Sequence, residues 1–492
     1  MADQKNLHFI FDDRFHPSSS ISNVVGNSTF GEILHKRTKL SNKIKELLFE
    51  MTDIPVDNFY LIRDIADIEN LRQTIKETSR HSIFVHFMSY AVIINEDHFL
   101  LALKKAMYID TIMTIHQNDP LIYYFPEGSG YLNFLDHVST RGNVFYPSNF
   151  EEESVLKPND FVVDISKLQN FLQFFSGGFE ARHFNALKGD LFTLTKTSSD
   201  RSKMRKEHDY YHLLPPEMKG WFVAPYNFTN NERVASYTME RLNIPDMALQ
   251  WIHGAISPND LATFLDKVFF FITHRPRRSV SKDSYIKSQN DLYYTKVLER
   301  INTLKQLPEY SRLHMLIETG TSYNSIDEVF ADYNVLYNKY ASYNQEFYEV
   351  IGHGDLCFSN ILYDKSTNLM KFIDPKGAVQ EEDLWVNPYY DLAKLSHSIF
   401  GNYDYINNEM FTVSLDSNCG FHLDIEIKEL TTSQAVFRDK LEQYGIDIFI
   451  VRLFEASLFL SMLPLHIDNP RKVFAFVLNA IHIIEELKNN GK

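Results

Sequence analysis

The most informative stretch of this chain is Ile351–Gly377, with the sequence IGHGDLCFSNILYDKSTNLMKFIDPKG. Within it, two apolar runs, Ile361–Tyr363 and Met370–Ile373, flank the polar segment Asp364–Asn368. Short apolar runs on either side of a polar turn are typical of two strands joined by a hairpin. We therefore expect a loop, a strand, a turn and a second strand, with Asp374 directly after the second strand.

The polar residues of this stretch have the spacing that phosphoryl transfer needs. His353-Gly354-Asp355 is followed by Asn360 and then by Asp374. The reaction requires a carboxylate that orients the attacking hydroxyl, oxygen ligands for Mg²⁺ and a cation on the nucleotide phosphates. Asp355 is the candidate for the first role, and Asn360 and Asp374 are hard oxygen ligands of the kind that Mg²⁺ prefers. An isolated Asp355 would more often be a surface or capping residue, and the joint spacing argues against that alternative.

The pattern H-x-D-x4-N followed by an aspartate is the arrangement found in protein kinases. Here Gly354 replaces the usual Arg, and Asp374-Pro375 replaces Asp-Phe. The motif HGDxxxxN…IDP resembles the aminoglycoside phosphotransferase and choline kinase superfamily of small-molecule kinases. The resemblance covers roughly residues 170–492 and implies an α+β, bilobal, protein-kinase-like fold.

Three stretches are similar to bacterial phosphotransferase domains associated with capsule or surface-polysaccharide synthesis. They are IDPKG at 373–377, NPYYDLAKLSHSIFGNYD at 387–404 and ASLFLSMLPLHID at 456–468. The resemblance implies that His353 braces the catalytic loop by hydrogen bonding and that Asp391 anchors the same loop from the start of a helix. The alternatives are a general base for His353 and a plain N-cap for Asp391.

A strand-rich lobe is expected before the catalytic loop. The run Glu180–Leu187, the turn Lys188–Asp190 and the run Leu191–Thr197 predict a hairpin. A kinase needs a strand lysine over the phosphates, held by a helix glutamate. Lys196 ends the second strand, and Glu207 follows in the polar helical segment Lys203–Leu214. That pairing also fits the resembling family; the alternatives to Lys196 are the helix cations Lys203, Arg205 and Lys206.

Two further nucleotide contacts are predicted from position. Gly177 and Gly178 open the hairpin and could place backbone N–H groups on phosphate, although no G-x-G-x-x-G is present and a simple entry turn is the alternative. The run Tyr237–Leu242 resembles the strand that leads to the hinge between kinase lobes. The adenine would then take backbone hydrogen bonds near Glu240 and Leu242.

Beyond residue 255 the periodicity is helical. The predicted helices are 257–273, 291–305, 325–348, 446–463 and 470–488. We expect a strand-rich kinase-like lobe at 166–255 and a helical lobe at 256–492. Tyrosines at 333, 337, 340 and 343 recur at helical spacing, which favours a half-buried stripe over a substrate wall.

The first 165 residues predict a separate α/β domain. Leu7–Phe11 and Ser82–Ile94 have strand composition, Thr38–Met51 and Asp67–Thr78 have helical spacing, and Pro147–Asp160 has the composition of a solvated connection. In proteins of polysaccharide synthesis a kinase-like domain can be joined to a nucleotidyltransferase-like domain. This segment lacks the Gly-rich nucleotide loop of such an enzyme, so a degenerate domain, substrate recognition and dimerisation all stay open.

Composition sets the remaining limits. The 492 residues are 44% apolar and 23% charged, which fits a globular chain of several domains. Two cysteines exclude a disulfide framework and fit a reducing compartment. The net charge of −15 argues against a nucleic-acid surface. It would suit a cationic acceptor such as choline or an aminoglycoside, although net charge says little about one pocket.

The start Met1–Lys5 lacks the pattern of a signal peptide, and the apolar run Ile448–Leu465 contains Arg452 and Glu455. We expect a cytoplasmic protein without membrane insertion, and self-association is left open.

These observations predict an ATP- and Mg²⁺-dependent kinase, with GTP as an alternative donor. By resemblance, its acceptor is a small molecule such as a sugar or amino alcohol of surface-polysaccharide synthesis. A nucleotide-binding pseudokinase and an aminoglycoside- or choline-type kinase are the main alternatives. A protein kinase is disfavoured, because no A-P-E motif and little room for an activation loop follow Asp374.

Overall fold

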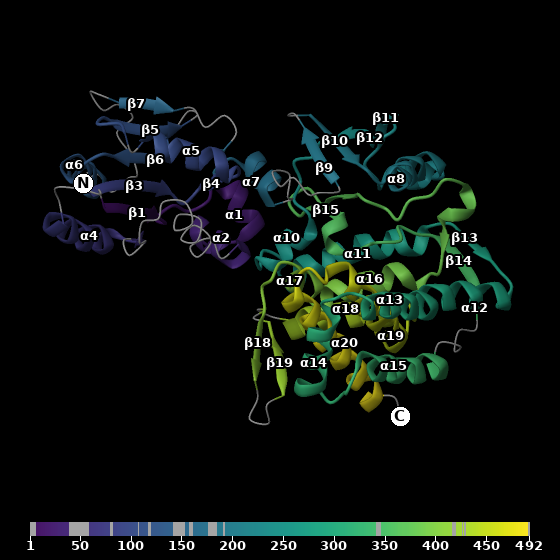
Figure 1. Ribbon diagram of the computed structural model, residues 1–492. Helices are drawn as coiled ribbons and strands as arrows, with labels where there is room; N and C mark the ends of the chain where they lie inside the picture. The colour runs from purple at the N-terminus through teal and green to yellow at the C-terminus, as the bar shows by residue number, and fades with distance from the viewer. Residues whose placement is uncertain are drawn as a thin grey trace. The chain divides into compact units, whose positions relative to one another are not determined.

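The chain divides into two compact units, Met1–Ala181 and Arg182–Lys492, which are described separately. The computed structural model (Figure 1) describes residues 6–38, 59–78, 82–106, 108–116, 120–140, 153–156, 161–175, 185–189, 192–340, 346–415, 420–425, 427 and 430–490. Helix α7 (Leu168–Phe175) belongs to the first unit, whereas the expected boundary near residue 165 assigned it to the strand-rich lobe.

The first unit contains a six-stranded mixed sheet in the order β2-β1-β3-β6-β5-β7. Strand β1 pairs in parallel with β2 and β3, and β6 pairs antiparallel with both β3 and β5. The strands are β1 (Asn6–Asp12), β2 (Phe59–Ile62), β3 (Ser82–Met88), β5 (Ile112–His116), β6 (Pro120–Phe125) and β7 (Glu153–Leu156). All seven residues of β3 are buried, as expected for a central strand covered on both faces.

Helices surround this sheet, and two further strands form a separate two-stranded ribbon. The helices are α1 (Ser19–Val25), α2 (Phe30–Thr38), α4 (Ile65–Thr78), α5 (Glu96–Ala106), α6 (Gly128–Thr140) and α7, with β4 (Ala91–Ile93) paired to β8 (Val162–Asp164). The first unit therefore has the expected α/β character, with its main core between the sheet and helices α4, α5 and α6.

Local differences from the expected elements have identifiable causes. Helix α4 begins at Ile65, two residues before the expected start at Asp67, because the carboxylate of Asp64 accepts the Asp67 backbone N–H and caps the helix there. The expected connection 147–160 contains β7, which gains its backbone partners by pairing in parallel with β5. The expected helix 38–51 lies outside the described residues after Thr38.

The second unit begins with a four-stranded antiparallel sheet in the order β11-β12-β10-β9. Its strands are β9 (Asn185–Gly189), β10 (Thr193–Ser198), β11 (Pro225–Asn230) and β12 (Ala235–Glu240). Helix α8 (Arg201–Leu213) follows β10 and is capped by the Asp200 carboxylate, which accepts the Lys203 backbone N–H. The predicted β9–β10 hairpin is confirmed for the described residues; Gly177 and Gly178 lie outside them.

The rest of the second unit is mainly helical, which confirms the expected α+β class with a smaller strand-rich lobe and a larger helical one. The helices are α9 (Pro216–Lys219), α10 (Met247–Ile252), α11 (Pro258–His274), α12 (Lys282–Asn290), α13 (Lys296–Lys305), α14 (Tyr310–Gly320), α15 (Ile326–Tyr340), α16 (Tyr389–Ile399), α17 (Tyr403–Asn407), α18 (Leu430–Gln443), α19 (Ile448–Met462) and α20 (Pro470–Asn490). Helix α19 is buried along nearly its whole length and packs against α13, α15, α16 and α20 (Figure 1).

Short strands and single turns connect these helices. The strands are β13 (Arg277–Ser279), β14 (Tyr348–Ile351), β15 (Ile361–Asp364), β16 (Leu369–Phe372), β17 (Trp385–Val386), β18 (Thr412–Leu415) and β19 (Phe421–Asp424). The short helical turns are η2 (Asp291–Thr295), η3 (Phe358–Asn360), η4 (Glu381–Leu384) and η5 (Leu463–His466).

Two expected helices are shorter than their periodicity indicates. Helix α15 is described over Ile326–Tyr340, and Tyr348, the last residue of the expected helix, instead begins β14 and pairs with Ser279. The segment 291–305 begins with the π-helical turn η2, so α13 itself starts at Lys296. Of the expected half-buried stripe, Tyr333 and Tyr337 are buried in the core and Tyr340 is partly buried, whereas position 343 lies outside the described residues.

Among the described residues, one helical segment, Ile448–His466, is long and apolar enough to cross a membrane by length and composition. The charges of Arg452 and Glu455 therefore do not exclude a membrane span by that criterion, and the expectation of a protein without membrane insertion stays a prediction. In the structure 72% of its most apolar 18-residue window is buried inside the protein, and core helices of soluble proteins commonly have this composition.

Candidate active site

The loop that contains His353 and Asp355 follows β14 and leads into the β15–β16 hairpin, as predicted. Asn360 ends the turn η3 directly before β15, and Asp374 follows β16. Gly354 has φ 77°, and a Cβ there would lie 2.5 Å from Cβ of Lys376. Only glycine fits both the backbone conformation and this close approach. This explains why glycine takes the position at which protein kinases have Arg.

His353 braces the loop through both ring nitrogens. Its Nε2–H donates to the carbonyl of Ile373 at 2.8 Å, and its Nδ1 accepts the backbone N–H of Asp355 at 3.1 Å. Burial lowers the pKa of His353, which keeps the imidazole neutral in this arrangement. The ring thus joins the start of the loop to the end of β16, and both nitrogens are already occupied.

Asp391 holds the same loop from helix α16. Its carboxylate accepts the backbone N–H groups of His353 and Gly354 at 3.0 and 2.9 Å. Asp391 lies inside the first turn of the helix, whose N-cap is Pro388, so the alternative of a plain N-cap is wrong. The guanidinium of Arg275 neutralises it in an ion pair that is almost fully buried and also donates to the carbonyl of Pro388.

The Asp355 side chain is held by Asn360 and by Lys394, and Lys394 was not among the site residues predicted from the sequence. The Asn360 side-chain amide donates to the Asp355 carbonyl at 2.8 Å and to its carboxylate at 3.2 Å. The Lys394 ammonium lies 2.8 Å from Asp355 Oδ1. Burial alone would raise the pKa of Asp355, but Lys394 outweighs it, and the pKa is lowered. The Asp355 side chain keeps 42% of its surface exposed, so the carboxylate is ionised and accessible.

Lys196, Glu207 and Asp374 meet across the two lobes. The Lys196 ammonium lies 2.7 Å from Glu207 Oε2 and 2.9 Å from Asp374 Oδ1. The hydroxyl of Tyr237, the cross-strand partner of Lys196, donates to Glu207 at 2.9 Å. Burial disfavours the Lys196 ammonium, but the carboxylates of Asp374 and Glu207 outweigh it and raise the pKa of Lys196. The lysine is therefore charged although it is buried.

The alternative cations on α8 have other positions. Lys203 lies 3.8 Å from Glu207 with half of its side chain exposed, and Arg205 pairs with Asp209. The backbone carbonyl of Lys206 accepts the N–H of Ala378. Lys196 is thus the buried partner of Glu207, in the geometry expected from the sequence.

The expected hinge lies where β12 ends. Glu240 is the last residue of that strand and has an exposed side chain, and the N–H of Arg241 donates to the carbonyl of Phe192. Leu242 follows in the connection to α10 and is partly exposed. The predicted backbone contacts of Glu240 and Leu242 with adenine stay a prediction.

Asn360 and Asp374 have the donor atoms that Mg²⁺ would need. The Asn360 amide nitrogen is used by Asp355, so the amide oxygen is the atom available to a cation. Asp374 has 41% of its side chain exposed, and Lys196 contacts only its Oδ1. No group of three or more His, Cys, Asp or Glu side chains that could hold a metal occurs among the described residues. A magnesium ion here would therefore take further oxygens from nucleotide phosphates and water, as it commonly does.

Comparisons with known proteins give structural likeness alone. No family model matches the sequence, and no curated protein does. A thermostable mutant of aminoglycoside phosphotransferase APH(4)-Ia, in a ternary complex with ADP and hygromycin B, has a TM-score of 0.36 at 11% identity, over 66% of this chain and 98% of the other.

Two further solved structures are similar at the same level. Aminoglycoside-3'-phosphotransferase of type VIII has a TM-score of 0.29 at 14% identity, over 59% of this chain and 84% of the other. Ethanolamine kinase of Plasmodium vivax has a TM-score of 0.31 at 10% identity, over 61% of this chain and 81% of the other. At these scores the function has to be argued from the residues of the site.

Proposed function

We propose that the second unit is a kinase that transfers the γ-phosphoryl group of ATP to a hydroxyl of a small molecule. The observation that carries this proposal is the contact of Lys196 with both Glu207 and Asp374, next to a loop that holds Asp355 and Asn360. A buried strand lysine paired to a helix glutamate, a base and two oxygen ligands are the parts that phosphoryl transfer uses.

Each of these site residues has a role in the proposed phosphoryl transfer. The Asp355 carboxylate orients the acceptor hydroxyl and accepts its proton. The hydroxyl oxygen forms a bond to the γ-phosphorus while the bond to the β–γ bridging oxygen breaks, and ADP leaves. Lys196 holds phosphate oxygens, and Glu207 positions the lysine. Asn360 and Asp374 would hold Mg²⁺, which neutralises charge on the phosphates when bound.

The acceptor suggested by the resemblance is a sugar, an amino alcohol or a related precursor of a surface polysaccharide. GTP is an alternative donor. A pseudokinase with the same contacts would bind nucleotide without turnover, and the missing glycine-rich motif motivates this second candidate.

Thermal stabilisation by nucleotides tests the proposal first. A ligand that binds only the native state raises the melting temperature by mass action. We expect ATP or GTP to stabilise the protein only with Mg²⁺ and expect Asp374→Ala to abolish the shift. Asp439→Ala removes an exposed carboxylate of α18 and should keep it. If no nucleotide shifts the melting temperature of the wild type, the kinase proposal is wrong.

A further inference from the structure

A cavity of about 460 Å³ in the second unit is lined by Asp355 and is strongly basic. Its charged lining consists of one carboxylate, that of Asp355, and five cations: Lys203, Lys296, Arg300, Lys376 and Lys394. The whole chain has a net charge of −15, so this excess of cations differs from the average of the sequence. Clefts lined by one sign of charge concentrate ligands of the opposite sign.

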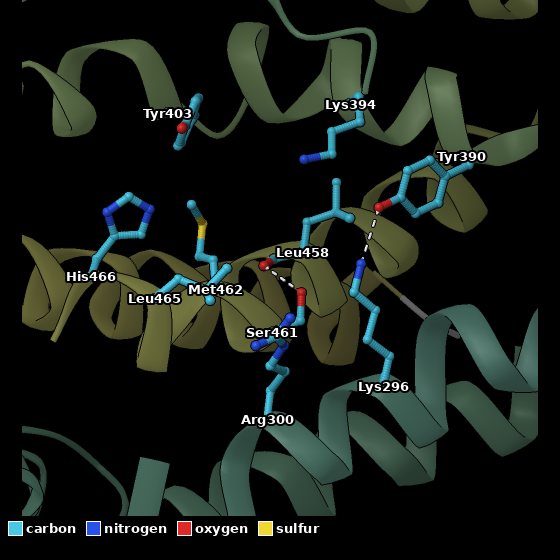
Figure 2. Close-up of a pocket in the computed structure, with 10 residues that line it drawn as sticks. All are labelled: Lys296, Arg300, Tyr390, Lys394, Tyr403, Leu458, Ser461, Met462, Leu465 and His466. Atoms are coloured by element: carbon cyan, nitrogen blue, oxygen red, sulfur yellow. Dashed lines mark hydrogen bonds between the residues drawn. The ribbon is translucent and has the colours of Figure 1, made fainter. Parts of the chain in front are cut away.

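Two helices carry three of these cations, Lys296 and Arg300 on α13 and Lys394 on α16. Lys296 and Arg300 lie four residues apart on α13, as do Tyr390 and Lys394 on α16. Residues with this spacing share one face of a helix. Figure 2 shows Lys296 and Arg300 reaching from one helix toward the side where Tyr390 and Lys394 project from another. The Lys296 ammonium donates to the Tyr390 hydroxyl at 3.3 Å, which steadies one side of the cavity.

A second cavity of about 220 Å³ adjoins the first. Both cavities are lined by the same four side chains, those of Lys296, Arg300, Tyr390 and Lys394. It adds Ser461, His466 and the apolar side chains of Met462 and Leu465, all shown in Figure 2. The combined space therefore offers room beside Asp355 for the body of a small acceptor, with cations on the wall between the two cavities.

Arg300 has no hydrogen-bond or ion-pair partner among the described residues, although it is half-buried. A guanidinium presents a rigid set of donors that matches the two oxygens of a carboxylate or phosphate. Lys196, Glu207 and Asp374 line neither cavity. The cations of α13 are thus additional to the lysine expected on the nucleotide phosphates.

We propose that the acceptor is anionic: a small molecule with a phosphate or carboxylate group, which Arg300 and Lys296 hold, and a free hydroxyl at Asp355. This inference rests on the proposed kinase function and narrows its substrate class. A cationic acceptor such as choline or an aminoglycoside would meet charges of its own sign in the same cavity.

Binding of inorganic phosphate tests the inference independently of the acceptor's carbon skeleton. The wild type is first saturated with Mg²⁺ and ADP, and phosphate and choline are then titrated calorimetrically at constant ionic strength. We expect phosphate to bind at millimolar concentration or below and choline not to bind. Absence of phosphate binding up to about 10 mM would overturn the inference. Acetate in a third titration distinguishes a preference for carboxylate from one for phosphate.

Variants show whether the phosphate occupies the proposed place. Arg300→Gln should weaken phosphate binding at least tenfold, and Arg300→Lys should weaken it less. Arg312→Gln, which removes an exposed arginine of the neighbouring α14, should leave it unchanged. If Arg300→Gln binds phosphate as the wild type does, the anion lies elsewhere, for example beside ADP, and the inference is wrong.

The turnover of matched acceptors gives a second measurement. Glucose, glucosamine, glucuronate and glucose 6-phosphate have one skeleton and differ in charge. Among those that are phosphorylated, kcat/KM should be highest for an anionic member, and Arg300→Glu should reverse the order in favour of glucosamine. A highest kcat/KM for glucosamine in the wild type would contradict the inference while leaving the kinase function intact. Failure of ADP to bind in the first step would instead contradict the kinase function itself.

Discussion

The ammonium of Lys394 lies 2.8 Å from Oδ1 of Asp355, the carboxylate expected to receive the acceptor's proton. Lys394 also stands three residues after Asp391 on α16, so one helix both anchors the loop backbone and pairs with its aspartate. This contact holds Asp355 ionised and fixes its side chain within the basic cavity. Catalysis in this protein should therefore depend on α16 as well as on the loop.

Replacement of Lys394 should lower turnover without loss of nucleotide binding. In Lys394→Met the Asp355 carboxylate loses its counter-charge and its fixed position, so we expect kcat to fall about 100-fold, within the range for misplaced catalytic groups. The nucleotide-induced shift in melting temperature should persist, because Lys394 contacts neither Lys196 nor Asp374. The exposed Lys287→Met on α12 is the control and should behave as the wild type does. Equal kcat values for Lys394→Met and the control would show that the contact has no catalytic role.

Asp355→Asn should separate binding from chemistry. The amide keeps the shape of the side chain but cannot accept the proton, and a positioned base contributes about 10²–10⁴ in rate. We expect kcat to fall about 1,000-fold while Mg²⁺-dependent nucleotide stabilisation is retained. Steady-state assays with an active acceptor and thermal shifts measure the two quantities. Near wild-type turnover would mean that another group is the base.

Arg275→Met should destabilise the second unit strongly. The substitution leaves the buried Asp391 carboxylate without its ion-pair partner, and removal of one partner of a buried pair typically costs about 3–5 kcal/mol. Urea unfolding monitors the free energy. Arg277→Met, two residues on and exposed, should cost less than about 1 kcal/mol. A loss as small as that of the control would show that solvent or another cation replaces Arg275.

Asp404 should make stability fall with rising pH. Burial raises the pKa of Asp404 to about 7, and its Oδ2 has no hydrogen-bond partner. Between pH 4 and 7 the folded state keeps a proton here that the unfolded state has released. The contribution of Asp404 to the free energy of unfolding is therefore fully present below about pH 4. It is lost as the pH rises through 7, at up to about 1.4 kcal/mol per pH unit.

The variant Asp404→Asn isolates this contribution. It cannot titrate, so its free energy of unfolding should depend less steeply on pH than that of the wild type between pH 5 and 7. Unfolding in urea at several pH values measures the difference, and the exposed Asp439→Asn is the control. Parallel pH profiles for Asp404→Asn and wild type would show that Asp404 is ionised throughout.

Much of the site could be predicted because its residues are close in sequence. The distances from Asp355 to Asn360 and Asp374 along the chain are those of a loop followed by a hairpin, and strand and turn composition indicate that hairpin locally. Lys196 and Glu207 lie on a strand and the helix that follows it, so their pairing is also a short-range property.

The residues that were missed act across long separations. Arg275 meets Asp391 from a position 116 residues away, and Lys394 of helix α16 meets Asp355 of the loop. Spacing within one helix places Lys394 on the face of Asp391, and this was the available signal. What that face contacts depends on how α16 packs against the loop.

Local sequence patterns were sufficient to predict the strand–turn–strand hairpin, the candidate base and oxygen ligands, and the strand lysine with its glutamate, because backbone periodicity and turn chemistry act over a few residues. Tertiary structure alone decided the sign of charge around Asp355. The chain as a whole is acidic, yet packing of α13 near α16 gathers Lys296, Arg300 and Lys394 around one carboxylate. Charge in a pocket depends on which helix faces meet, and no short-range pattern specifies that.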